Sequence, residues 1–309
     1  MRTTTFLKAS LLSKLKVNKE MEIWAILALL LKVLLYVLSF LAVGTGLFIF
    51  HFRSFLSQPT LAYCCKLVRK SSLIGSIIAP LLLLMTAGNI GGDLQSAFDP
   101  LMINIALSSK AGQSVSVLFF GFLFVLLWIS LFQNQRPIPG ILGFALILSS
   151  FSLYGHSTIN GFSSQLLIVL HLGAISFWVG SFLPLRYSTQ GKIEEENLFQ
   201  IAHQFGVYAV YYIGVLLITG LMLGTILVGG IEQLVTSDYG RAFLFKLFFA
   251  TTLLGIGAFN KFRLVPQLKN NNLSHAIKLR KSINVEISIL FIILVISSLL
   301  TTSIELPSM

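Results

Sequence analysis

The stretch LHLGAISFWVGSFLPLRY, residues 170–187, decides the class of fold. Its apolar run is typical of a helix that crosses a bilayer, which needs about 20 such residues. The run nevertheless contains an ionisable imidazole, His171, near its start and an indole, Trp178, two turns later. Ionisable groups inside a membrane span cost free energy and commonly mark a functional pathway. His171 is therefore the first candidate functional residue.

The composition of the whole chain agrees with a membrane protein. The 309 residues are 55% hydrophobic and 11% charged, with a mean hydropathy of +0.87, whereas soluble domains carry about 25% charged residues. The net charge of +11 does not indicate a nucleic-acid partner, because no RNA- or DNA-binding motif is present and basic cytoplasmic loops give the same excess. The adjacent Cys64 and Cys65 form no disulfide framework.

The apolar runs predict an all-α, polytopic membrane helical bundle with about eight transmembrane helices. Turn or charge signals separate the runs, and no separator is long enough to form a folded domain. We therefore expect a single transmembrane domain over residues 21–309. The expected spans lie near residues 24–50, 72–92, 113–132, 138–155, 163–184, 205–229, 242–260 and 283–303.

Lysine and arginine predict the orientation of this bundle. Alternate separators are basic, and basic loops face the cytoplasm. The opposite separators hold only Lys110 and Arg241. Both ends of the helical domain are then expected on the outer side of the membrane. The basic residues on the expected cytoplasmic side are Arg53, Lys66, Arg69, Lys70, Arg136, Arg186, Lys192 and those within residues 261–281.

Residues 1–20 form a basic N-terminal extension that this orientation places on the outer side. Its charges, from Arg2 to Lys19, oppose the positive-inside preference of everything that follows. We interpret the segment as a mis-assigned extension ahead of a natural start at Met21. A basic amphipathic arm on the inner face is the alternative, and it would require a different number of helices.

Several polar side chains converge on the outer side of this topology. His171 lies roughly 12 Å deep at about 1.5 Å per residue, and His156 lies where the fourth span reaches the same side. Met85, Asn89 and Asp93 recur every four residues and share one helix face. Thioether with imidazole fits a copper ion, Cu(I) above all, with Asn89 or a backbone carbonyl orienting the imidazole. The alternative for His171 is a structural histidine that bonds a neighbouring helix.

The other polar residues of the spans have structural interpretations. Trp178 is expected to pack near the His171 face. Lys246 is expected to pair with Asp93 or Asp238, although it could also extend outward or set the field of the site. Glu286 is expected to pair with basic residues just before it, with a cation exit station as the alternative. His51 is expected in a solvated basic loop.

Five motifs in order resemble the copper resistance protein D (CopD) family of inner-membrane proteins. They are GHS (155–157), LHLGAISFWVGSFLPL (170–185), TSDYGRAFLFKLFFA (236–250), NKFRLVPQL (260–268) and LRKSINVEISILFIILVISSLLTTSIELP (279–307). The resemblance covers about residues 150–307 well. The first half is similar more loosely, through Lys32 and GTG at 44–46. Ser157 and Ser181 stand where the family has alanine and glycine, and both replacements are small.

The resemblance implies a location in the bacterial inner (plasma) membrane, which puts both ends of the helical domain in the periplasm. It also implies copper transport across that membrane, with a periplasmic copper-binding protein as donor. It implies uptake toward the cytoplasm as a contribution to copper homeostasis and resistance. Carried over to this chain, His156 and His171 are the expected copper ligands, either on one ion or as two successive stations. Besides the periplasmic donor protein, the expected partner is membrane lipid.

Two other classes stay open. A b-type haem protein would need two histidines facing across one leaflet, for which His171 with His156 is the candidate pair and His203 is on the wrong side. A membrane protein that holds copper without passing it is equally compatible with the sequence. An enzyme is not expected, because no nucleophile–base pair, P-loop or Gly-rich nucleotide motif is present.

Overall fold

The computed structural model describes residues 2–131, 137–153, 161–190, 198–228, 230–270 and 273–302. Side chains are described from residue 26 to residue 297 within these ranges, except at residues 231 and 270. All regular structure in this part of the chain is helical. Helices satisfy every backbone hydrogen bond within one segment, which the hydrocarbon core of a bilayer requires. The predicted all-α membrane bundle is confirmed.

Eight long helices make up the bundle, and short helical turns connect several of them. The long helices are α1 (Arg2–Phe52), α2 (Gln58–Gly91), α4 (Lys110–Leu131), α5 (Pro137–Ser150), α6 (Phe162–Ser188), α7 (Leu198–Val228), α9 (Asp238–Phe259) and α11 (Leu273–Thr302). The short ones are η1 (Arg53–Phe55), η2 (Gln95–Phe98), α3 (Pro100–Ser108), α8 (Ile231–Thr236), η4 (Asn260–Leu264), α10 (Val265–Gln267) and η5 (Leu268–Asn270).

The number of helices able to cross a membrane is close to the expected eight. Among the described residues, 6 helical segments are long and apolar enough to cross a membrane, and α5 is a shorter apolar helix. The end of α11 includes residues 298–302, whose side chains are not described. The predicted extension at residues 1–20 also lies outside the described side chains.

Capping groups set where several helices begin and end. Ser57 accepts the backbone N–H of Thr60 and starts α2, and Ser237 accepts that of Gly240 and starts α9. Gly92, at φ 85°, ends α2 in the left-handed conformation that glycine adopts most readily. The expectation that residues 51–71 separate two spans is wrong for most of that stretch. Cys64, Cys65 and the neighbouring basic residues lie on α2 itself.

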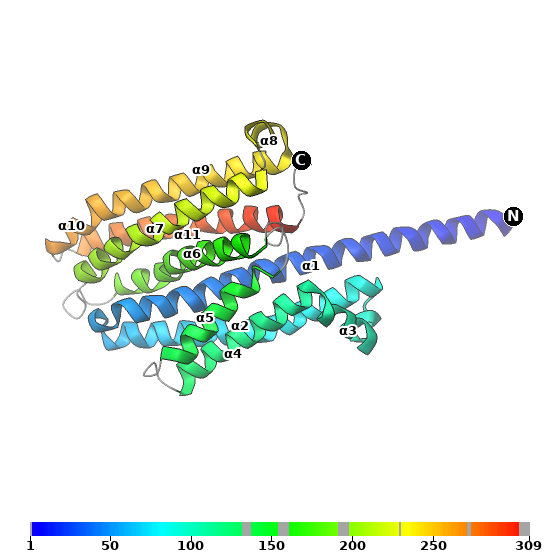
Figure 1. The fold of residues 1–309 in the computed structure, drawn as a ribbon, viewed down its shortest axis with the longest axis horizontal. Coiled ribbons are helices and arrows are strands. Elements are labelled where there is room, and N and C mark those ends of the chain that lie inside the picture. Colours follow the sequence, from blue (N-terminus) through cyan, green and yellow to red (C-terminus); the bar gives the residue numbers. More distant parts are fainter. Residues whose placement is uncertain are drawn as a thin grey trace.

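Helix α1 lies at the centre of the bundle (Figure 1). It packs against α2 on one side and α6 on the other, with α4 and α5 beyond α2 and with α7, α9 and α11 on the α6 side. Gly44 of α1 and Gly180 of α6 meet so closely that a Cβ on either would overlap the backbone of the other helix. Thr45 adds a 2.9 Å hydrogen bond from its hydroxyl to the Gly180 carbonyl. Small residues therefore fix α6, and with it His171, against the centre of the molecule.

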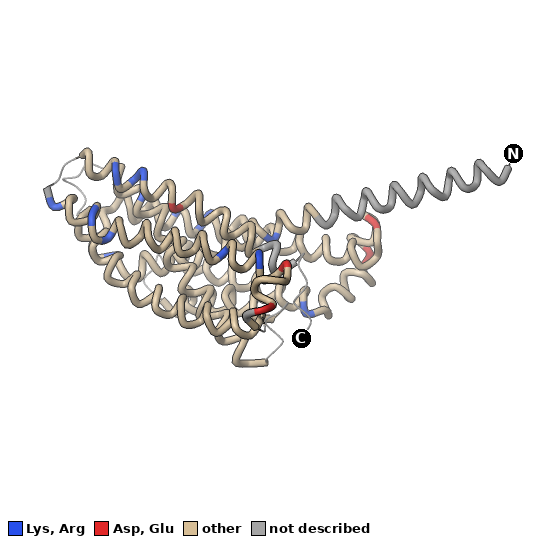
Figure 2. Tube along the Cα trace, turned by 90° about the horizontal axis from the view of Figure 1, so that it is seen from above, with Lys and Arg blue, Asp and Glu red and all other residues tan. Residues whose placement is uncertain are grey.

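Charge is distributed unequally between the two ends of the bundle (Figure 2). We call the end that holds η1, α10 and the start of α11 the basic end, and the other the acidic end. Asp93, Asp99, Glu232 and Asp238 belong to the acidic end. The described side chains of the basic end include Arg53, Lys66, Arg69, Lys70, Arg186, Lys261, Arg263, Lys269, Lys278, Arg280 and Lys281.

Candidate functional site

His171 lies on α6 and contacts α7. Its Nδ1 is 3.0 Å from the Thr219 hydroxyl oxygen, and that hydroxyl donates its own proton to the Val215 carbonyl at 2.7 Å. When the Thr219 hydroxyl gives its one proton to Val215, it accepts the second hydrogen bond from Nδ1–H. In that tautomer of the neutral imidazole, Nε2 keeps a lone pair, which is the arrangement found in metal-binding histidines.

The surroundings of the ring leave little freedom to reorient. A Cβ added to Gly220 would lie 3.2 Å from His171 Cε1, so glycine at this position makes room for the imidazole. Lys246 of α9 is close enough to His171 for an electrostatic interaction. The site thus joins α6, α7 and α9. The orienting group is Thr219, which the sequence analysis did not identify, because a hydroxyl within an apolar span most often bonds its own helix.

The residues of α2 and of the turn after it that were expected to bind copper have other surroundings in the structure. Asp93 is exposed in the turn after α2, and its carboxylate accepts the Ser96 backbone N–H at 2.7 Å. Hydrogen bonds from the Ser96 side chain and backbone hold the pKa of this carboxyl below its usual value. Asn89 is also exposed, whereas Met85 is partly buried. The α2 end packs against η2 and α3, and the hydrogen bonds of Asp93 stay in its own turn.

No preassembled group of metal ligands is present in the described ranges. There, no three His, Cys, Asp or Glu side chains lie close enough together to hold a metal ion. His156 belongs to the stretch 154–160, outside the described residues. The assignments of His156, His171, Asp93 and Met85 as copper ligands therefore stay predictions.

Two expected ion pairs are not formed. Asp238 pairs with Arg241 at 3.2 Å and Asp93 caps its turn, so neither described carboxylate neutralises Lys246. Glu286, 3% exposed, accepts a hydrogen bond from the Asn260 amide at 3.1 Å in place of the expected basic partner. Asp238 thus pairs within its own helix, whereas Glu286 bonds to a neighbouring element, η4.

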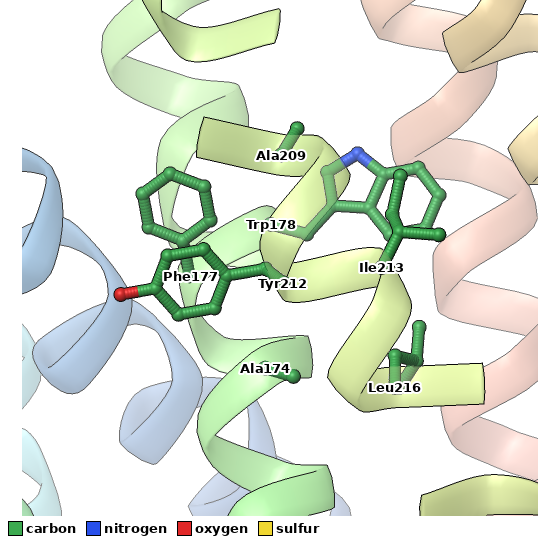
Figure 3. Close-up of a pocket in the computed structure, with 7 residues that line it drawn as sticks. All are labelled: Ala174, Phe177, Trp178, Ala209, Tyr212, Ile213 and Leu216. Atoms are coloured by element: carbon green, nitrogen blue, oxygen red, sulfur yellow. The ribbon is translucent and has the colours of Figure 1, made fainter. Parts of the chain in front are cut away.

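An apolar crevice lies at the α6–α7 interface (Figure 3). Its first residue on α6, Ala174, comes three residues after His171. Phe177 of α6 stacks on Tyr212 of α7 with ring centroids 3.9 Å apart. The crevice has no room for a water molecule, so this level of the interface is dry. Its lining residues are Ala174, Phe177, Trp178, Ala209, Tyr212, Ile213 and Leu216. Trp178 is 8% exposed, consistent with its expected packing role.

His51 was expected in a solvated loop, and this expectation is wrong. It lies near the end of α1, and its ring packs against Tyr208 with centroids 4.6 Å apart and against Phe177 at 5.5 Å. Its Nδ1 is 2.8 Å from the Leu47 carbonyl, to which it can donate only as N–H. His51 therefore borders the Phe177–Tyr212 stack from the α1 side.

Two family models match the chain. Residues 21–165 match the copper resistance protein D-like N-terminal domain, and residues 199–300 match copper resistance protein D. The first range begins within α1 and ends at the start of α6, and the second spans α7 to α11. The greater part of α6, with His171, lies between the two matched ranges.

A curated relative supports the same assignment. The chain is 28% identical over 221 residues to the copper transport protein CutJ of Bacillus subtilis (strain 168), an alignment that covers 67% of this chain and 40% of the relative. The chain thus spans about two fifths of the length of that relative. No solved structure matches. With two family models matched in order along one apolar helical bundle, the chain belongs to the copper resistance protein D family of membrane proteins.

Proposed function

We propose that this protein moves copper ions across the membrane and that His171 binds the ion inside the bundle. The observation that carries the proposal is the hydrogen bond from His171 Nδ1 to Thr219. It favours the Nδ1–H tautomer, in which the Nε2 lone pair can bind a metal. Imidazole is a good ligand for copper, and an orienting partner of this kind commonly improves metal affinity.

The proposed direction is uptake, from the acidic end toward the basic end. The positive-inside preference puts the basic end in the cytoplasm (Figure 2). A monovalent cation that moves inward then gains about 2.3 kcal/mol per 100 mV of membrane potential. No ATP-binding motif is present in the sequence, so the electrochemical gradient and exchange of the ion between ligands supply the driving force.

The ion reaches His171 from the acidic end. We propose that a periplasmic copper-binding protein delivers it and that His156 receives it before His171. Beyond His171 the route continues along the α6–α7 crevice. Because the Phe177–Tyr212 stack closes that interface to water, passage requires α6 and α7 to separate at this level.

Copper flux into proteoliposomes tests transport directly. Liposomes that contain the purified protein and a trapped Cu(I) chelator should accumulate copper faster than protein-free liposomes of the same lipid. Binding of copper without flux would show a protein that holds the ion. A haem absorption spectrum in the purified protein, with neither copper binding nor flux, would replace the proposal with the haem alternative.

A further inference from the structure

Three polar side chains form a connected group inside the bundle near the basic end. The Ser282 hydroxyl of α11 donates to Asn260 Oδ1 at 2.7 Å, and Asn260 Nδ2 donates to Glu286 Oε2 at 3.1 Å. Glu286 is 3% exposed and Asn260 is 8% exposed. We call Ser282, Asn260 and Glu286 the polar cluster. It is separate from the His171 site, and the copper proposal assigns it no role.

The backbone at Asn260 has a π-helical turn. The α-helical part of α9 ends at Phe259, and residues Asn260–Leu264 continue as η4, a π-helix. Such turns are rare and occur frequently at functional sites. This turn holds the Asn260 side chain against α11, where its amide meets the carboxyl of Glu286.

Glu286 has no cation to balance an ionised carboxylate in the described part of the chain. The ion pair formed there joins Arg241 to Asp238, and Arg186 of α6 donates to Asn284 at 2.7 Å. Lys261, beside Asn260, lies over the Phe262 ring. The described basic side chains on the elements packed against the cluster are Lys32 and His51 of α1, His171 and Arg186 of α6, Arg241, Lys246, Lys261 and Arg263 of α9 and η4, and His275, Lys278, Arg280 and Lys281 of α11, and Asp238 of α9 is acidic.

An unbalanced carboxylate in a membrane interior is unfavourable, and such groups typically carry a proton or lie on an ion pathway. The donors around Glu286 are oxygen and amide groups, which are hard ligands and a poor match for Cu(I). A proton therefore suits the polar cluster better than a copper ion does.

The carboxyl lies beside the proposed copper route. A Cβ built on Gly257 of α9 would be 3.3 Å from Trp178 Cζ2 and 3.6 Å from Glu286 Oε1. Trp178 also lines the α6–α7 crevice (Figure 3). Both side chains thus border the same point on α9, and one of them, the indole, also lines the crevice.

We propose that Glu286 is a proton-binding site that exchanges its proton for the charge of a cation passing through the neighbouring crevice, an inference that rests on the proposed copper transport. As the cation enters, the carboxyl O–H bond breaks and the proton passes to water at the basic end. The carboxylate then balances one positive charge. When the cation leaves, a proton returns from the same water, so the cycle transports no net proton.

Infrared difference spectroscopy of the purified protein tests the proposal. The spectrum of the copper-loaded minus the copper-free protein should show loss of a protonated-carboxyl C=O band, shifted in D2O. Glu286→Gln, which can still accept the Asn260 hydrogen bond, should lack this band. The exposed Glu232→Gln is the matched control and should keep it. Asn260→Leu should shift the band, because it removes the hydrogen bond to Glu286.

Infrared titration with pH, without copper, separates this inference from the copper proposal. A carboxyl band that titrates in the parent protein and is absent from Glu286→Gln identifies the proton site even if no copper is bound. Parent spectra identical to those of Glu286→Gln would overturn the proton site. A titrating Glu286 band that copper leaves unchanged, in a parent shown to bind copper, would overturn the exchange.

Discussion

The Thr219 hydroxyl is the side-chain hydrogen-bond partner of the His171 imidazole. With its proton given to the Val215 carbonyl, it accepts from the imidazole Nδ1–H and favours the tautomer whose Nε2 has a lone pair. Partners of this kind set the tautomer and ring orientation of metal-binding histidines, and their removal typically lowers metal affinity by about 10–100-fold. At the scale of the residue, the proposed copper site depends as much on this hydroxyl as on the imidazole.

Replacement of Thr219 by valine tests that dependence. Valine keeps the branched shape of threonine without the acceptor oxygen, so Thr219→Val should lower Cu(I) affinity by roughly tenfold or more. Competition with a chromophoric Cu(I) chelator measures the affinity of the purified protein. The matched control is Thr225→Val, on the same helix, whose hydroxyl bonds only its own backbone. Equal affinities in both variants would show that Thr219 does not orient a copper ligand.

His171 could be selected from the sequence because an imidazole in an apolar span is unusual by itself. Thr219 could not, since its importance depends on which helix faces α6. His51 was placed in a loop because the basic residues after it resemble a separator, although they continue on α2. For Glu286 the sequence showed nearby basic residues, yet only the π turn reveals that Asn260 is its partner.

The α1–α6 contact is the element-scale feature that positions His171. Gly44 and Gly180 bring the two backbones together, and a new Cβ at Gly180 would meet main-chain atoms of α1 that cannot rotate away. Small residues at such contacts are typical of helices packed within membranes. Their loss would separate α6 from α1 and displace the site.

A pair of glycine substitutions tests this contact. Gly180→Ala should destabilise the folded protein by about 1–3 kcal/mol, the usual range for overpacking. Gly173→Ala, on the same helix, should have a much smaller effect, because its Cβ would meet only Leu148 at 3.5 Å. Thermal unfolding in detergent, followed by tryptophan fluorescence, compares the two. A Gly180→Ala protein as stable as Gly173→Ala would contradict the assigned contact.

The sequence predicted helices better than their boundaries. Apolar runs located all eight long helices, since exclusion from water acts on each run separately. The sequence could not show that α2 begins at Gln58, because charged residues at the end of a long membrane helix resemble a loop. The short segments η2, α3 and α8 depend on contacts with the ends of neighbouring helices and carry no span-length signal.

At the scale of the whole molecule, the separation of charge between the basic and acidic ends predicts the orientation (Figure 2). In a background without Cys64 and Cys65, a cysteine at Gln95 should react with an impermeant thiol reagent added to intact spheroplasts. A cysteine at Lys269 should react only after the membrane is opened. The reverse pattern would place the basic end outside and invert the proposed direction of transport.

The central claim is that copper binds His171 on its way through the bundle. The most direct measurement is copper flux into proteoliposomes by His171→Gln, with the parent and Thr225→Val as references. Glutamine can keep a polar contact with Thr219 and is a far poorer ligand for copper than imidazole. The account predicts a folded variant whose flux falls to that of protein-free liposomes. A His171→Gln protein that transports copper at the parent rate would contradict it and leave His171 a structural residue of the α6–α7 contact.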